Sequence, residues 1–63
     1  MFDWTSYLGH RVIVRLGYSF LVEVVVMETS AQGRVKFKTL LGNISWNENN
    51  EYTFVEDLGE CLS

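Results

Sequence analysis

The sequence predicts an all-β fold: a small five-stranded antiparallel barrel with a short N-terminal helical turn. Apolar and polar residues alternate from position 10 to position 55, as strands with one buried face require. Glycine- and asparagine-containing turns recur at intervals of about 8 to 12 residues, which is typical of small sandwiches and barrels. The chain has 63 residues and no proline, so we expect residues 1–63 to form a single small domain.

The first element is one helical turn within residues 1–8. Asp3 is a good N-cap, and Gly9 stands where a helical turn ends. A turn this short is not stable alone, so it must pack on the sheet. The side chains available for this contact are Trp4, Tyr7 and Leu8.

Two strands follow the turn. Residues 10–16 alternate with a period of two, which places Val12, Val14 and Leu16 on the inner face. After Gly17, residues 18–29 form a longer β-branched stretch whose inner face carries Phe20, Val22, Val24 and Val26. Its opposite face is also apolar, with Leu21, Val25 and Met27 interrupted by Glu23. We therefore expect this strand to be covered on both sides, either by its own curled sheet or by another subunit.

The second half of the chain contains three more strands. Residues 30–33 read as a hairpin turn in which Gly33 takes a positive φ. Residues 34–40 then form a strand with Val35, Phe37 and Thr39 inward. The remaining prediction is a turn at 42–43, a short strand at 44–46, a polar tip at 47–51, a strand at 52–55 and a closing turn at 56–59.

This order of elements resembles the small Src-homology-3-type (SH3-like) and Tudor-type barrels. The resemblance covers residues 10–59 and includes the Gly-centred hairpin, the basic strand, the segment Gly-Asn-Ile-Ser-Trp and the closing segment Tyr-Thr-Phe-Val-Glu-Asp-Leu. It implies a fold and no function, because the paired tryptophans and the proline-tyrosine motif of the proline-binding members are missing. No functional residue is transferred from these families.

The composition predicts self-association. A chain this short buries only about 60% of its unfolded surface, and its single cysteine excludes an internal disulfide. Hydrophobic residues nevertheless make up 48% of the chain, which leaves little polar surface to cover a monomer. We expect a homo-oligomer that associates through the outer face of the second strand, at Leu21, Val25 and Met27.

The charges are unevenly distributed along the chain. All five basic residues precede residue 39, whereas the last 21 residues carry only acidic charge, and the net charge is −3. Nucleic-acid binders are usually basic overall. An RNA or single-stranded nucleic-acid contact is therefore the alternative function, through Arg15, Arg34, Lys36 and Lys38. The simpler interpretation is that the basic strand is solvated or pairs with acidic residues of the last strand.

No catalytic, cofactor or metal site is predicted. His10 is the only histidine and has no neighbouring ligands or nucleophile, so we expect it to be exposed or structurally satisfied. Cys61 has no basic neighbour that would activate its thiol. The adjacent Glu56 and Asp57 would point to opposite faces if extended, so they cannot act as a facing acid/base pair.

The remaining candidates are aromatic. Tyrosine and tryptophan can anchor a peptide while one polar edge stays wet, and the candidates for this role are Tyr18, Trp46 and Tyr52. Together these observations predict a non-enzymatic, self-associating interaction module that docks a protein or peptide partner. With no apolar run of membrane-spanning length, we expect a cytoplasmic location.

Overall fold

The computed structural model describes residues 2–60 and is all-β, with five antiparallel strands in one sheet. A 3₁₀ turn, η1, precedes the strands. The elements in chain order are η1 (Trp4–Tyr7), β1 (His10–Leu16), β2 (Phe20–Thr29), β3 (Arg34–Thr39), β4 (Ile44–Glu48) and β5 (Tyr52–Glu60). Five strands and the short N-terminal turn are as the sequence predicts.

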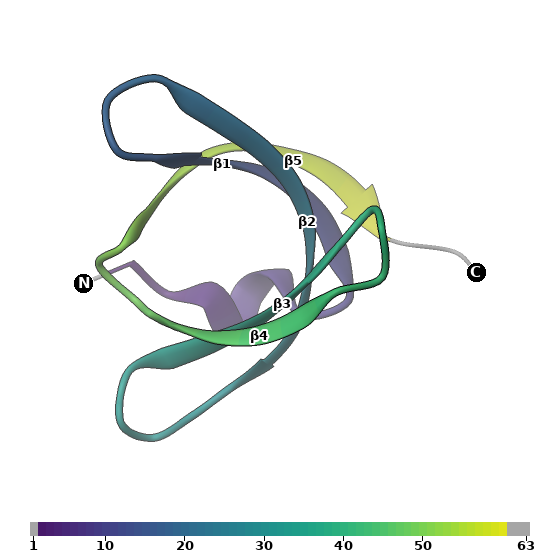
Figure 1. The fold of residues 1–63 in the computed structure, drawn as a ribbon. Helices are drawn as coiled ribbons and strands as arrows, with labels where there is room; N and C mark the ends of the chain where they lie inside the picture. The colour runs from purple at the N-terminus through teal and green to yellow at the C-terminus, as the bar shows by residue number, and fades with distance from the viewer. Residues whose placement is uncertain (1, 61–63) are drawn as a thin grey trace.

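The strands lie side by side in the order β4-β3-β2-β1-β5, so β4 and β5 are the two edges. The sheet is strongly curled, and η1 lies at its concave side (Figure 1). Within residues 2–60 no hydrogen-bonded ladder joins β4 to β5. The predicted closure into a barrel is therefore not confirmed, and by its hydrogen bonds the sheet is open.

η1 forms because Asp3 satisfies the start of the turn. Its carboxylate accepts a hydrogen bond from the Thr5 backbone N–H at 3.1 Å and another from the Thr5 hydroxyl. These bonds, the hydroxyl first, hold the pKa of Asp3 below its usual value. The turn directs Trp4 into the core, where it is 2% exposed, whereas Leu8 is exposed and does not pack as predicted.

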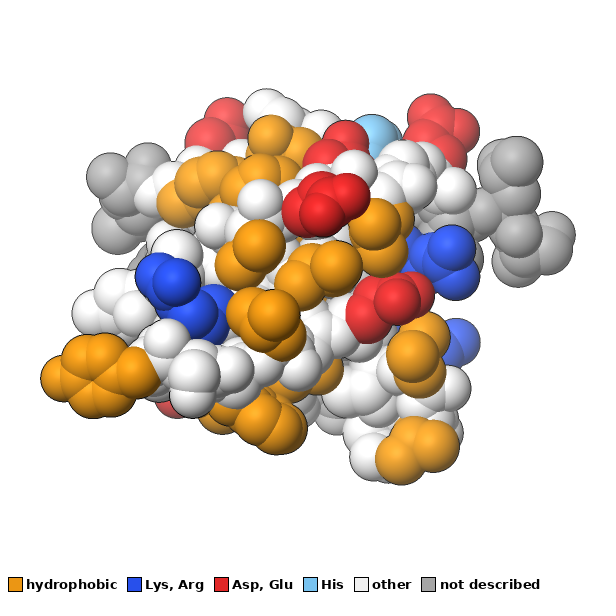
Figure 2. Space-filling model, turned by 90° about the horizontal axis from the view of Figure 1, so that it is seen from above, with side chains coloured by type: hydrophobic (Ala, Val, Ile, Leu, Met, Phe, Trp, Pro, Cys, Tyr) orange, Lys and Arg blue, Asp and Glu red, His pale blue; other side chains and the backbone are white. Residues whose placement is uncertain are grey.

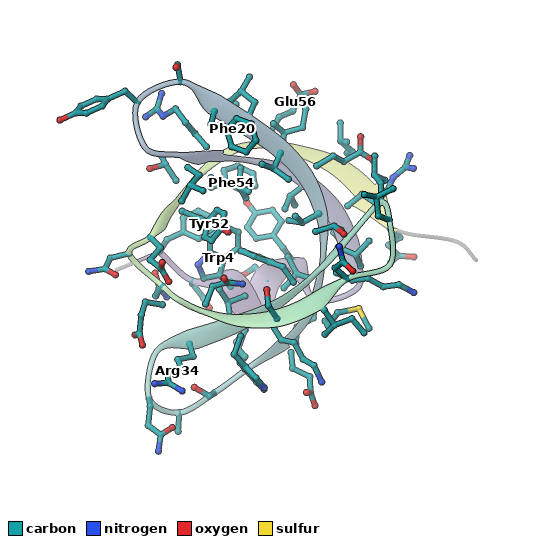
Figure 3. The ribbon with its side chains drawn as sticks, in the orientation of Figure 1. Trp4, Phe20, Arg34, Tyr52, Phe54 and Glu56 are labelled. Atoms are coloured by element: carbon teal, nitrogen blue, oxygen red, sulfur yellow. The ribbon has the colours of Figure 1, made fainter. Side chains whose placement is uncertain are left out.

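The core lies inside the curl and combines Trp4 of η1 with alternate residues of the three central strands. Its fully buried members are Trp4, Val12, Val14, Val24, Val26, Val35 and Phe37. Tyr7, Val22, Tyr52 and Phe54 are partly buried against this cluster. Figure 3 shows Trp4, Tyr52 and Phe54 inside the curl and Glu56 outside it. The predicted inner faces are confirmed for most positions, but Leu16 and Phe20 are exposed because they lie at the rim beside the β1–β2 turn.

The β2–β3 hairpin has the predicted turn. Gly33 has φ of +83°, and its N–H donates to the Ser30 carbonyl at 3.2 Å. A register shift between Val26 and Glu28 places Met27 in a bulge of β2. Bulges bend and twist a strand, and this one lies midway through the curled sheet.

The end of the chain corrects one prediction. Residues 56–59 do not form a closing turn, because they continue β5 as far as Glu60 along β1. Two register shifts opposite β1 absorb the extra residues, and Gly59 supplies a φ of +96° beside the second. Sequence alternation fails across a bulge, which explains the wrong expectation.

Three other strand boundaries also differ. β2 begins at Phe20 because residues 17–19 form the turn after β1, and β3 ends at Thr39, one residue before its predicted end. β4 extends to Glu48, two residues beyond its predicted end. No helix within residues 2–60 is long and apolar enough to cross a membrane.

Candidate interaction surfaces

Four exposed apolar residues gather where β2 begins and where β3 turns into β4. Phe20, Leu21, Leu40 and Leu41 are 63%, 57%, 69% and 90% exposed. Together with Val22, Glu23, Thr39 and Asn43, they line one shallow hollow of about 390 Å³. We call these four residues the apolar patch. Of its members the sequence singled out only Leu21 as a surface residue, because Phe20 alternates with core positions and Leu40 and Leu41 lie at a turn.

The outer face of β2 carries the predicted self-association residues, and the structure separates them. Leu21 and Met27 are exposed, whereas Val25 is half-buried. Val25 lies between Arg11 of β1 and Lys38 of β3 in the register. The predicted face is therefore interrupted at its centre by the charged residues that flank Val25. Only Leu21 belongs to the apolar patch.

Acidic side chains separate the apolar ones on the neighbouring outer surface. Figure 2 views the molecule over β1, β2 and β5, and hydrophobic side chains alternate there with acidic ones. Glu23 faces Ile13 across the β1–β2 ladder, and Glu56 faces Ile13 from β5. This part of the surface is mixed, in contrast to the apolar patch.

Two cations of the basic strand are already paired. Arg34 Nε lies 3.1 Å from Glu48 Oε1, and Lys36 Nζ lies 3.1 Å from Glu28 Oε2. These partners come from β4 and β2, which flank β3. The expectation that the last strand is the neighbour that supplies them within the chain is wrong, because β5 pairs with β1 at the other end of the sheet.

Arg15 and Lys38, the other predicted nucleic-acid contacts, are exposed on β1 and β3. Neither takes part in an ion pair within residues 2–60, whereas Arg34 and Lys36 do. The remaining free charge is too sparse to form a continuous basic track along a phosphate backbone.

The predicted aromatic anchors lie in three different environments. Tyr18 is fully exposed at the tip of the β1–β2 turn. Trp46 lies on the outer side of β4, where Lys36 Nζ is 5.7 Å from its ring centroid. Tyr52 packs at right angles on Phe37, 5.2 Å between centroids. The described contacts do not bring the three into one groove.

His10 has a structural partner at one end of the curl. Its Nδ1 lies 3.0 Å from Asp57 Oδ1, and the Tyr7 ring meets it edge-on at 6.0 Å. Asp57 also accepts the Gly59 backbone N–H at 2.9 Å. The Gly59 bond first, and then His10, hold the pKa of Asp57 below its usual value. The two side chains thus join the start of β1 to the end of β5.

Phe2, which sequence reasoning did not single out, packs against the aromatic side chains inside the curl. Its ring stacks on Phe54 at 4.9 Å and meets Trp4 at 4.6 Å. Its carbonyl accepts a hydrogen bond from Asn49 Nδ2 at 3.1 Å. The Trp4 indole Nε1 beneath it is buried and has no hydrogen-bond partner among the described residues. No sequence pattern marks a contact between positions 2 and 49.

The chemistry-bearing residues remain dispersed. Within residues 2–60 no group of three histidine, cysteine or acidic side chains could hold a metal ion. Glu56 faces Ile13 in the register, whereas Asp57 is bound to His10. Cys61 lies outside the described residues.

Comparison with known protein families, curated proteins and solved structures finds no match for this chain. The resemblance to SH3-like and Tudor-type barrels therefore stays a prediction.

Proposed function

We propose that the chain is a non-enzymatic interaction module that associates with copies of itself and docks a protein partner. The observation that carries the docking part is the apolar patch. It concentrates four large side chains, each between 57% and 90% exposed, around one hollow. Contiguous apolar surface on a small protein commonly marks an interaction site.

The free energy gained when a partner covers the apolar patch is large compared with the gain from covering a polar surface of the same size. Burial of a Leu or Phe side chain contributes about 1.5–3 kcal/mol. The rim of the hollow includes Glu23, Thr39 and Asn43, which gives an apolar centre with polar groups at its edge, as in protein interfaces. The partner surface that fits is therefore apolar at its centre, and a protein segment provides it.

The non-enzymatic part of the proposal rests on the sequence. A single histidine and a single cysteine without basic neighbours provide no nucleophile and base pair. The ion pairs of Arg34 and Lys36 favour protein docking over the alternative nucleic-acid contact.

The test is a patch variant, Leu40→Ser together with Leu41→Ser. Both residues lie at the turn after β3, so the variant should keep the fold, which circular dichroism checks. The matched control is Leu8→Ser, an exposed leucine outside the patch. Immobilised wild type and Leu8→Ser should capture and crosslink the same protein from the native cells, and the patch variant should lose it. Equal capture by the patch variant would contradict the docking proposal.

A further inference from the structure

The two edges of the open sheet differ in how they are protected. β5 has two register shifts and carries the like charges of Glu56, Asp57 and Glu60. Bulges and charges are the usual means by which natural sheets prevent edge-to-edge pairing. β4 pairs with β3 without a register shift, and its first three residues, Ile44 to Trp46, contain no charge and no proline. β4 is therefore the unprotected edge.

The ladder shows which main-chain groups of β4 are free. Asn49 N–H donates to the Gly33 carbonyl at 3.0 Å, and Thr39 N–H donates to the Asn43 carbonyl at 2.8 Å. Because hydrogen-bonded and non-hydrogen-bonded pairs alternate in an antiparallel ladder, the odd-numbered residues of β4 bond to β3. The N–H and C=O groups of Ile44, Trp46 and Glu48 point to the open edge.

The main-chain groups of Glu48 are already hydrogen-bonded within the β4–β5 turn. Glu48 N–H donates to Glu51 Oε1 at 2.8 Å, and the Glu48 carbonyl accepts the Glu51 N–H at 3.1 Å. Among residues 2–60, the free groups of this edge are thus the N–H and C=O of Ile44 and Trp46, with Ser45 between them.

We propose that β4 pairs antiparallel with β4 of a second copy about a two-fold axis at Ser45. In this register Ile44 of each copy lies opposite Trp46 of the other, and each such pair exchanges both main-chain hydrogen bonds. All the free groups of Ile44 and Trp46 in both copies are used, and Glu48 stays outside the paired segment. The result is one continuous sheet across an isologous dimer, the commonest form of homo-oligomer.

The side chains favour the same register. Ile44 and Trp46 face Lys38 and Lys36 across the β3–β4 ladder, which places both on the outer face of the sheet. They are 51% and 45% exposed. Pairing brings each isoleucine against a tryptophan, and pairs of an aromatic with a β-branched residue stabilise a sheet. Lys36 already lies over the Trp46 ring and is neutralised by Glu28, so it adds no unpaired charge to the contact.

The occupant is a second copy because the edge is complementary to itself. With the two-fold axis at Ile44, the free groups of Trp46 would lie opposite the turn of the other copy. With the axis at Trp46, the free groups of Ile44 would lie opposite Glu48, whose own groups are already bonded. Only the axis at Ser45 matches every free donor to a free acceptor. This inference deepens the self-association part of the proposed function and rests on it. The docking part uses the apolar patch, a different surface.

Crosslinking tests the register. A non-hydrogen-bonded antiparallel pair has a Cα separation of about 4.5 Å, within the range that a disulfide spans. In a Cys61→Ser background, Ser45→Cys should form a disulfide dimer in a glutathione redox buffer. Thr53→Cys, an exposed position on β5, is the control and should stay monomeric. Equal crosslinking of both variants, or none, would overturn the edge proposal.

A second variant removes the main-chain donor. Ile44→Pro lacks the N–H that points to the open edge, and proline is tolerated at the first residue of an edge strand. Ile44→Val keeps the N–H and the β-branched shape. We expect Ile44→Pro to weaken the dimer at least about tenfold relative to Ile44→Val, since two interface hydrogen bonds are lost. Size-exclusion chromatography over a dilution series measures the difference.

The outcomes separate the proposals. A dimer that survives Ile44→Pro but is lost in Val25→Glu would place the interface on the outer face of β2 and overturn the edge pairing. A monomeric wild type would overturn all self-association, while capture by the apolar patch would remain as an independent result.

Discussion

Trp4→Ala should remove much of the stability of the fold, because one side chain from the N-terminal turn fills the centre of the curl. A buried Trp removes roughly 150–250 Å² from water, which corresponds to about 4–6 kcal/mol. Its indole N–H, which has no hydrogen-bond partner within residues 2–60, costs about 1–3 kcal/mol. The net loss on truncation is therefore about 3 kcal/mol, at the lower end of the usual range for Trp→Ala in a core.

This loss of about 3 kcal/mol is a large share of the total free energy of unfolding. A chain of this length has an unfolding free energy of roughly 3–9 kcal/mol. Urea unfolding followed by far-UV circular dichroism at low protein concentration measures the change. The matched control is Trp46→Ala, because Trp46 is nearly half exposed and contacts the Lys36 ammonium at 5.7 Å. An exposed contact of this kind is worth about 0.5–1 kcal/mol. Equal losses for the two variants would refute the assignment of the core.

Three further predictions concern local features. Trp4→Phe, which keeps an aromatic ring but removes the unpartnered N–H, should destabilise by less than half of the Trp4→Ala loss in the same urea experiment. Gly33→Ala should cost about 1–2 kcal/mol, because an L side chain is strained at φ of +83°; Gln32→Ala in the same turn, where φ is not positive, should cost less than about 0.5 kcal/mol. The folded-state pKa of Asp57 is lowered by Gly59 and His10, so its stabilisation is present above the ordinary pKa and is lost as the pH falls through the folded pKa. The difference in urea midpoint between wild type and Asp57→Asn should therefore shrink between pH 6 and about pH 2, and a constant difference would contradict the role of this carboxylate.

The fold was predictable where alternation is regular. Val12, Val14, Val24, Val26, Val35 and Phe37 all lie on the predicted inner faces. Period-two patterning specifies which face of a strand is buried, and Gly33 specifies a turn of positive φ. Both signals are local and need no knowledge of the neighbouring strand.

The prediction failed where the outcome depends on pairing. Residues 56–59 continue β5 because β1 offers them a partner and bulges absorb the mismatch. The partners of Arg34 and Lys36 follow from the strand order, which no local pattern encodes. Exposure of Leu16 and Phe20 likewise depends on their place at the rim.

The candidate surfaces were predictable only in part. Tyr18 and Trp46 are exposed, as expected of docking anchors beside turns, but Leu40 and Leu41 join the apolar patch through the turn after β3. The open edge of β4 could not be predicted, because it depends on the absence of a ladder between β4 and β5 within residues 2–60 and on the local bonds between Glu48 and Glu51.

We propose that this small open sheet acts by association with other chains of its kind. Sedimentation equilibrium of the wild type over a wide concentration series tests it most directly. We expect a reversible, concentration-dependent shift from the 7.3 kDa chain to a species of twice that mass. A single 7.3 kDa species at every concentration would contradict the claim.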